Sequence, residues 1–293
     1  MPLLFDAEPK IRQDQFRLIR DEINRFCGIE FQDDAMFVVE RRLRERLQAL
    51  GLPDYGQYHQ YLRYHPEARA EIERAIELLT TNETYFFRED YQLRAFHEEV
   101  LPDLKRRAES RGSKRLAIWS AGCSTGEEVY TLAILVASSR LFEGWEVRIF
   151  GNDISRRVLH TARRAVYGTS SFRTMPTQYE KYFVEVADGM QVHPEIRSMC
   201  HFGHMNLLER ERAAIVGRVD AVFCRNVLIY FDQVSRRKVI ESFYDRLQPG
   251  GYLFLGHSES LLNLSTAFEL VHLETDLVYR RPDTFGIPGA EYE

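Results

Sequence analysis

A glycine-rich turn follows a short apolar run near the middle of the chain, and it constrains the fold more than any other feature. Residues 116–119 form the apolar run, and the turn after it reads Ser120-Ala121-Gly122-Cys123-Ser124-Thr125-Gly126-Glu127-Glu128. Glycines without a Cβ atom permit tight curvature and a close approach of the backbone to a ligand. N–H groups at the start of a following helix favour a carboxylate or a phosphate. Alone, the turn also fits an ordinary strand-to-helix connection.

A second apolar run favours a nucleoside ligand. Residues 147–151 precede Asn152 and Asp153, which places an acid at the end of the next strand. At the carboxyl edge of a sheet, such an acid accepts hydrogen bonds from the hydroxyls of an adenosine ribose. Dinucleotides need Gly-x-Gly-x-x-Gly around a pyrophosphate, and the chain has neither that spacing here nor a P-loop motif. S-adenosylmethionine has no phosphate and suits the looser turn.

Apolar runs and helical patterns alternate along the second part of the chain. We expect strands at 116–119, 147–151, 219–223 and 252–256, and helices at 128–139, 154–165 and 233–247. This alternation predicts an α/β fold with a mostly parallel sheet covered on both faces. Residues 171–203 include Pro176, Gly189 and Pro194 and break the rhythm, so we expect a small inserted β subdomain there.

The first 80 residues show helical patterns and no strand signal. Three helices are expected, and the second has an apolar stripe of Val39, Leu43, Leu47 and Leu50 and ends at Gly51. Four arginines lie away from this stripe, namely Arg41, Arg42, Arg44 and Arg46. The simplest interpretation of these arginines is a solvated polar face. We therefore predict a helical domain over 1–80 and an α/β domain over 81–293.

Two further clusters accompany predicted strand or domain boundaries. Residues 220–231 begin with an apolar strand and continue into Cys224, Arg225, Asn226 and Tyr230. In an open parallel sheet, residues just past the strand ends line the ligand crevice. The alternative is that Asn226 caps a turn and Tyr230 is a core aromatic. Residues 78–88 form an aromatic stretch that ends in Arg88, which fits a crevice wall or a packed linker with a solvated arginine.

Composition excludes several classes of protein. The net charge of −5 gives no global basic field for nucleic acid, and no apolar run is long enough to span a membrane. The N-terminus lacks a secretory signal pattern, so we expect a cytoplasmic protein. Four scattered cysteines, and three histidines without a further ligand at metal spacing, favour no metal site. His257 and Ser258 are adjacent, so in an extended chain their side chains diverge and form no hydrolase pair. We interpret His257, Ser258 and Glu259 as a structural turn near the pocket.

Taken together, these clusters resemble the CheR-type chemotaxis receptor methyltransferases, which are protein-glutamate O-methyltransferases. The resemblance spans about 16–279 and rests on separated motifs in the same order: residues 81–88, 124–128, 152–154, 224–231 and the Gly256-His257-Ser258-Glu259 run. It implies a helical N-terminal domain for receptor recognition, a Rossmann-like catalytic domain and a small antiparallel β subdomain. It also implies methyl transfer from S-adenosylmethionine to glutamates of chemoreceptor cytoplasmic domains, with S-adenosylhomocysteine as product.

The resemblance assigns roles to residues by their position in these motifs. Arg88 and Tyr230 would lie nearest the transferred methyl group. The arginines of the second helix would meet an acidic receptor surface. Cofactor contacts would come from Asn82, Thr84, Arg88, Gly122, Glu128, Asp153, Asn206, Leu207, Cys224, Arg225 and Asn226.

One segment departs from the family pattern. Members that dock on a pentapeptide at receptor tails have a longer, glycine-rich loop in the β subdomain, and the corresponding segment 183–192 is short here. We therefore expect a monomeric enzyme that works without this tether. Two other classes stay open at this point: a methyltransferase that acts on RNA or a small molecule, and a non-catalytic sensor of S-adenosylmethionine.

Overall fold

The computed structural model describes residues 9–283 and contains two compact units. One unit comprises Met1–Thr81 together with Tyr230–Val234, and the other comprises Asn82–Ile229 and Ser235–Glu293. Each unit has its own core and is considered by itself.

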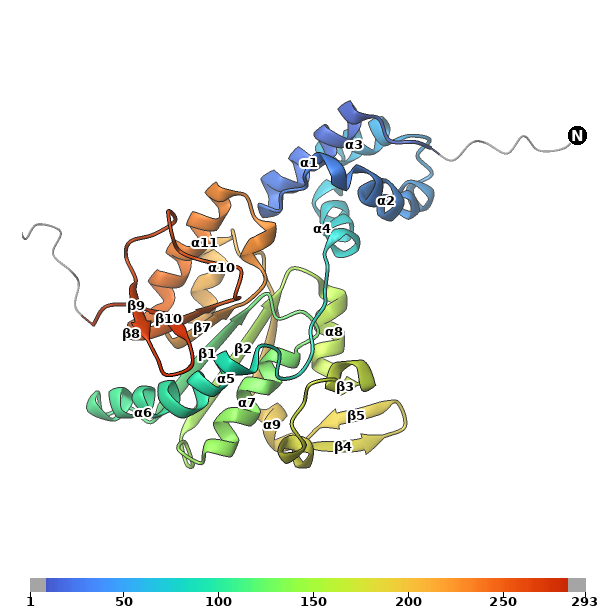
Figure 1. Ribbon diagram of the computed structural model, residues 1–293. Helices are drawn as coiled ribbons and strands as arrows, with labels where there is room; N and C mark the ends of the chain where they lie inside the picture. The colour runs from blue at the N-terminus through green and yellow to red at the C-terminus, as the bar shows by residue number, and fades with distance from the viewer. Residues whose placement is uncertain (1–8, 284–293) are drawn as a thin grey trace, which may run out of the picture. The chain divides into compact units, whose positions relative to one another are not determined.

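The first unit is built from helices (Figure 1). They are α1 (Gln13–Cys27), the short 3₁₀ turn η1 (Asp33–Ala35), α2 (Met36–Leu50), α3 (Tyr55–Tyr64) and α4 (Ala68–Leu79). The predicted apolar stripes are buried, since Phe16, Ile19 and Leu43 are fully inaccessible to solvent. α2 ends at Gly51, which adopts the left-handed conformation that a helix C-terminus commonly requires. The helix α3 was not predicted.

A buried ion pair links α2 to α4 within this unit. Arg46 donates two hydrogen bonds to Glu71, at 2.8 and 2.7 Å, and the Glu71 side chain is 1% exposed. The hydroxyl of Tyr58 in α3 donates a third, at 2.9 Å. A buried carboxylate needs such partners because desolvation of an isolated charge is costly. One carboxylate therefore connects three helices.

The second unit contains a seven-stranded sheet with the order β6-β2-β1-β7-β8-β10-β9. Its first five strands pair in parallel, and β10 pairs antiparallel with both β8 and β9, which confirms the predicted mostly parallel sheet. The strands are β1 (Arg115–Ala121), β2 (Glu146–Asp153), β6 (Cys200–His204), β7 (Val219–Cys224), β8 (Leu247–Leu255), β9 (Glu269–His272) and β10 (Leu277–Arg280). The strands β6, β9 and β10 were not predicted.

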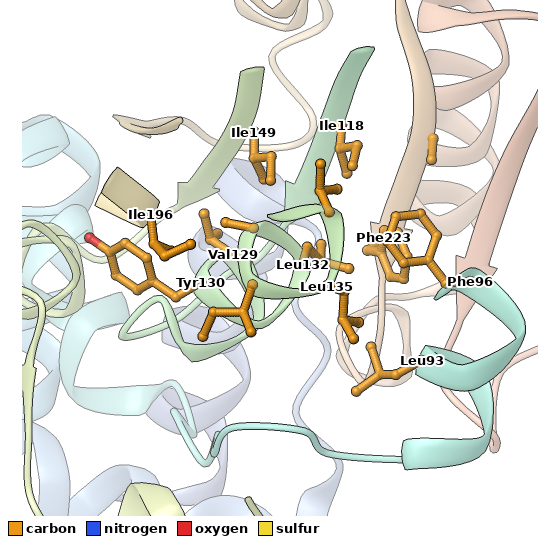
Figure 2. Close-up of a cluster of buried hydrophobic side chains, with 14 of the residues drawn as sticks. Leu93, Phe96, Ile118, Val129, Tyr130, Leu132, Leu135, Ile149, Ile196 and Phe223 are labelled. Carbon is orange, nitrogen blue, oxygen red and sulfur yellow. The ribbon is translucent and has the colours of Figure 1, made fainter. Parts of the chain in front are cut away.

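Helices cover both faces of this sheet (Figure 1). The first group consists of α5 (Asp90–Ala95), a π-helical segment η2 (Phe96–Val100), α6 (Leu101–Ser110), α7 (Glu127–Ser139) and α8 (Arg156–Arg164). It shares one apolar cluster with Ile118 and Ile149 of the sheet, and Figure 2 shows side chains of α7 beneath these two strands. Trp119 points to the other face and packs edge-on against Phe243 of α11 (Gln233–Arg246). The short helix α10 (Arg210–Ala213) and the turns η5 (Ala214–Val216) and η6 (Leu228–Tyr230) flank β7 in the chain.

A small antiparallel sheet lies in the chain between α8 and β6. It has the order β3-β5-β4, from β3 (Val166–Tyr167), β4 (Phe183–Val186) and β5 (Gly189–Val192). The 3₁₀ turns η3 (Thr169–Phe172) and η4 (Thr177–Tyr182) and the helix α9 (Pro194–Ser198) complete this region. The sheet begins before the predicted start of the insertion at 171. Residues 200–203 belong instead to β6, because their backbone pairs with β2 of the large sheet.

Candidate active site

The order of the strands places a ligand crevice at the carboxyl ends of β1 and β7. From β1 the chain proceeds outward through β2 to β6, and it then returns to β7 on the other side of β1. Open parallel sheets bind ligands where the strand order reverses in this way. The glycine turn follows β1, and residues 224–226 follow β7, so the topology brings two of the predicted motifs together.

The glycine turn has the backbone conformation that its sequence predicted. Gly122 has φ of +77° and Gly126 has φ of +93°. A Cβ atom on Gly122 would lie 2.6 Å from the Cγ2 atom of Val227, so glycine is required for the close approach of the turn to the loop after β7. The Ser124 hydroxyl donates to the carbonyl of Asn82 at 3.1 Å, which attaches the 82–88 segment to the turn.

Asp153 ends β2 and has a fixed orientation. One carboxylate oxygen accepts the N–H of Ser124 at 2.9 Å, and the other accepts the N–H of Ser155 at 2.9 Å. The side chain is buried beside the glycine turn. The carboxylate is therefore positioned by backbone donors at the strand end, where an acid accepts ribose hydroxyls.

Arg225 is the central charge of the crevice. Its guanidinium donates to Glu128 at 3.3 Å, to Glu89 at 3.2 Å and to the carbonyl of Arg88. Burial raises the pKa of Glu128, although Arg225 and the hydroxyl of Ser120 oppose that shift. Burial also acts to raise the pKa of Glu89, but Arg225 outweighs it, and the net shift is downward. One arginine thus holds two partly buried acids at the ligand edge of the sheet.

The segment that carries Arg88 has an unusual backbone. Phe87 and Glu89, on either side of Arg88, have φ of +58° and +57°. Such values are uncommon for residues other than glycine and often accompany functional sites. The Arg88 side chain donates to the carbonyl of Glu83 at 3.1 Å and its guanidinium carbon lies 5.8 Å from the centre of the Tyr85 ring. These contacts fix the position of the guanidinium.

The remaining predicted cofactor residues lie on neighbouring strand ends. Asn206 and Leu207 are buried just after β6, where the N–H of Met205 donates to the carbonyl of Asp153 at 3.0 Å. Cys224 is the buried last residue of β7, and burial raises the pKa of its thiol. Asn226 has φ of +60°. Thr84 is half-buried in the 82–88 segment.

Two acids outside the predicted set of cofactor residues, Glu89 and Glu259, organise the crevice. Glu89 accepts hydrogen bonds from Arg225 and from the side-chain amide of Asn226, the latter at 3.4 Å. It also lies 3.3 Å from the ring of His257. Glu259 accepts four backbone N–H groups, those of Asn226, Val227, Ile229 and Gly256, at 2.9, 3.0, 3.2 and 2.7 Å. Only the acidic character of the Gly-His-Ser-Glu run hinted at this second role.

His257 and Ser258 lie in the predicted turn, where their side chains do not diverge as they would in an extended chain. The Ser258 hydroxyl lies 3.0 Å from Nε2 of His257, because the two residues lie in a turn rather than in an extended strand. A hydrolase also needs N–H groups aimed at an oxyanion. The neighbouring N–H groups of Gly256 and Asn226 donate to Glu259 instead. The contact therefore does not make this turn a hydrolase site.

Five predicted site residues belong to the first unit. Arg46 pairs with Glu71, Arg42 donates to the carbonyl of Leu79 at 2.9 Å, and Arg44 lies 3.5 Å from Glu40. Arg41 is exposed and forms no hydrogen bond or ion pair with any residue in 9–283. Tyr230 is 40% exposed, and its carbonyl accepts the N–H of Glu30 at 2.8 Å.

The donor set of the crevice fits S-adenosylmethionine. This cofactor carries a sulfonium, an ammonium group, a carboxylate and a ribose diol. Glu128, Glu89 and Asp153 supply acids for the cationic groups and the diol. The Nε atom of Arg225 is buried and has no hydrogen-bond partner among the described residues, so a cofactor carboxylate would supply the missing acceptor. Within residues 9–283, no group of three or more potential ligands could hold a metal ion.

A Rossmann-like sheet with this crevice defines the class of S-adenosylmethionine-dependent methyltransferases. Comparison with family models identifies the particular family: residues 82–277 match the S-adenosylmethionine-binding domain of the CheR methyltransferases, and residues 14–80 match their all-α domain. The chain therefore belongs to the CheR methyltransferase family, and its cofactor is S-adenosylmethionine.

Relatives match the chain over most of its length. Chemotaxis protein methyltransferase 2 of Vibrio cholerae is 36% identical over 93% of this chain and 94% of its own length. The chemotaxis protein methyltransferase of Salmonella typhimurium is 38% identical over 87% of this chain and 86% of its own. That of Escherichia coli is 36% identical over 87% of each chain.

In the part of the chain that the structure describes, no helix is long and apolar enough to cross a membrane.

Proposed function

We propose that this protein transfers the methyl group of S-adenosylmethionine to glutamate side chains of chemoreceptor cytoplasmic domains, forming glutamate methyl esters. The observation that carries the proposal is the match of both the all-α domain and the cofactor domain to one family, together with relatives named chemotaxis protein methyltransferases. We place its action in the cytoplasm and expect a monomer.

The chemistry requires little of the protein beyond binding and alignment. A glutamate carboxylate, with a pKa of about 4.3, is ionised at neutral pH and needs no general base. The bound cofactor supplies an electrophilic methyl group on a sulfonium. Charge disappears as the ester forms, so a strong fixed cation against the carboxylate would hold the ground state more than the transition state. Arg88 and Tyr230 therefore orient the reacting groups at roughly 3–3.5 Å and transfer no proton.

The small sheet supports methylation without a pentapeptide tether. β4 and β5 pair from Phe183 to Val192 and are joined by a turn of only Ala187 and Asp188. Gly189 follows with φ of +134°, and a Cβ atom there would lie 2.3 Å from the carbonyl oxygen of Tyr167. This two-residue turn is shorter than the glycine-rich loop of tethered family members.

Radiolabelled methyl transfer to purified receptor fragments tests the proposed activity. We expect label on the fragment that is released as methanol in mild base, as a carboxyl ester requires, and no label when the acceptor glutamates are replaced by alanine. Base-stable label, or label only on RNA or a small molecule, would identify a different methyltransferase. Cofactor binding without any transfer would identify a sensor.

Calorimetry tests the absence of the tether separately. A receptor-tail pentapeptide should give no saturable heat with this protein, while S-adenosylhomocysteine in the same preparation binds. Receptor fragments with and without the tail should then show the same kcat/KM. Tight pentapeptide binding would contradict tether independence and leave the methyl transfer itself intact.

A further inference from the structure

A second hollow lies beside β6, on a part of the second unit that the cofactor crevice does not use. It has a volume of about 530 Å³. α7, α8, α9 and β6 contribute its walls, and the residues that matter here are Tyr130, Arg163, Arg197, Ser198, His201 and Phe202. Cys200, at its base, lies four residues before His204, the partner of Asp153 in β2. That spacing is roughly 13 Å along the strand.

The hollow collects positive charge without matching acids. Arg163 makes a hydrogen bond to the carbonyl of Phe202 at 3.0 Å, and neither Arg163 nor Arg197 forms a salt bridge with any residue in 9–283. His201 is exposed at the same place. By contrast, Arg164, the neighbour of Arg163 in α8, pairs with Asp188 at 3.5 Å. Arg163, Arg197 and His201 therefore line a cavity in a chain whose net charge is −5.

The groups around the hollow match the chemistry of a phosphoryl group. Guanidinium groups present planar pairs of N–H donors that bind phosphate oxygens in a bidentate manner. Ser198 also lines the hollow, with its hydroxyl donating to the carbonyl of Glu195 at 2.7 Å. The rings of Tyr130 and Phe202, with centroids 5.5 Å apart, give one wall an aromatic character, and the volume lies in the range of small-molecule sites. Figure 2 shows the Tyr130 ring beside Ile196 of α9.

We propose that this hollow binds a small phosphorylated molecule of about nucleotide size, with Arg163 and Arg197 contacting its phosphoryl group. The site is separate from the cofactor crevice, so it does not depend on the proposed substrate of the methyl transfer.

Calorimetry on the full-length protein saturated with S-adenosylhomocysteine tests this proposal, because saturation keeps adenosine compounds out of the cofactor crevice. Pyrophosphate and AMP are the probes, in a phosphate-free buffer of low ionic strength, and adenosine is the neutral control. We expect saturable binding of both probes and none of adenosine. Absence of saturable binding at millimolar pyrophosphate and AMP would overturn the proposal.

Variants locate the binding site. The double variant Arg163→Gln/Arg197→Gln should weaken AMP binding at least about tenfold, since hydrogen bonds to charged groups each contribute measurably. Arg164→Gln removes the same charge from the same helix outside the hollow and should leave the affinity unchanged. His201→Gln, at an exposed position that cannot disturb folding, should also weaken AMP binding. Unchanged S-adenosylhomocysteine affinity shows that each variant is folded. Equal affinities in all variants, or equal weakening by Arg164→Gln, would contradict the proposal.

Discussion

Glu259 accepts the backbone N–H of Asn226 at 2.9 Å, although 33 residues separate them in the chain. The same carboxylate accepts three further N–H groups, those of Val227 in the loop between β7 and η6, Ile229 in η6, and Gly256. This loop contains Asn226, a predicted cofactor residue, and leads directly to Tyr230. Glu259 is thus a positioning residue that acts through the loop.

Replacement of Glu259 by alanine should loosen this loop. Four N–H groups would lose a charged acceptor, and each such bond contributes roughly 1.5–3 kcal/mol. We expect S-adenosylhomocysteine to bind at least about tenfold more weakly by calorimetry, with a larger fall in kcat/KM. Glu269→Ala, which removes an exposed acid from β9, is the matched control. Unchanged cofactor affinity in Glu259→Ala would show that the loop holds its shape without this acid.

Arg46 should matter for stability. Its removal leaves the buried carboxylate of Glu71 with one charged partner, the exposed Arg74 at 3.6 Å, and loss of the main partner of a buried pair costs up to about 3–5 kcal/mol. Urea unfolding of Arg46→Ala should show this loss. The double variant Arg46→Met/Glu71→Met should be more stable than Arg46→Ala, because it leaves no unpaired charge. A single variant as stable as the wild type would mean that water reaches Glu71.

Arg41 should matter for substrate recognition. It is the arginine of the predicted four that has no partner in the described structure, so its charge is available to an acidic surface. We expect Arg41→Glu to raise the KM for receptor fragments about threefold to tenfold, equivalent to roughly 0.7–1.4 kcal/mol, and more at low ionic strength. Cofactor affinity and stability should not change. Lys238→Glu, at an exposed position of α11, is the charge-matched control. An unchanged KM would favour a solvated polar face.

Local signals predicted the parts of the site that depend on neighbours in the chain. Gly122, Asp153 and Arg225 follow strands, and the order of strands and helices was sufficient to place them at one sheet edge. The helix α3 was missed because Gly56 weakens its helical pattern, although Asp54 caps it by accepting two backbone N–H groups.

Long-range pairing was beyond the reach of sequence patterns. Glu89 and Glu259 accept hydrogen bonds from groups 137 and 33 residues away, respectively, and no periodicity encodes such contacts. The strand β6 is short, contains Gly203 and exists only through its pairing with β2. The sequence pattern of the α2 arginines predicted one solvated polar face, but Arg46 binds Glu71 on α4, 25 residues away in the chain.

Tyr230→Phe should separate catalysis from cofactor binding. If the hydroxyl orients the reacting groups, its loss should lower kcat about tenfold or more, since small misplacements are costly in a reaction that depends on alignment. The Kd of S-adenosylhomocysteine should stay near the wild-type value. Tyr244→Phe, on α11, is the matched control and should retain full activity. A Tyr230→Phe enzyme with full activity would remove this residue from the mechanism.

Cofactor binding should depend on the ionisation of Glu128. Burial raises the pKa of this acid above its usual value of 4.5, so it takes up a proton at a higher pH than an exposed glutamate. A raised pKa in the folded state means that Glu128 favours folding most below the unfolded pKa, and this contribution is lost as pH rises through the folded pKa.

Binding has the opposite dependence, because only the carboxylate attracts the cofactor's ammonium group. We therefore expect the affinity for S-adenosylhomocysteine to fall on acidification from a pH above 4.5. The Glu128→Gln variant should bind more weakly at neutral pH and lose this pH dependence. Glu89 keeps its charge over the same range because Arg225 lowers its pKa, so Glu89→Gln should retain the dependence. Calorimetry of all three proteins between pH 5 and 8 measures this, and an identical slope in Glu128→Gln and wild type would assign the titration to another group.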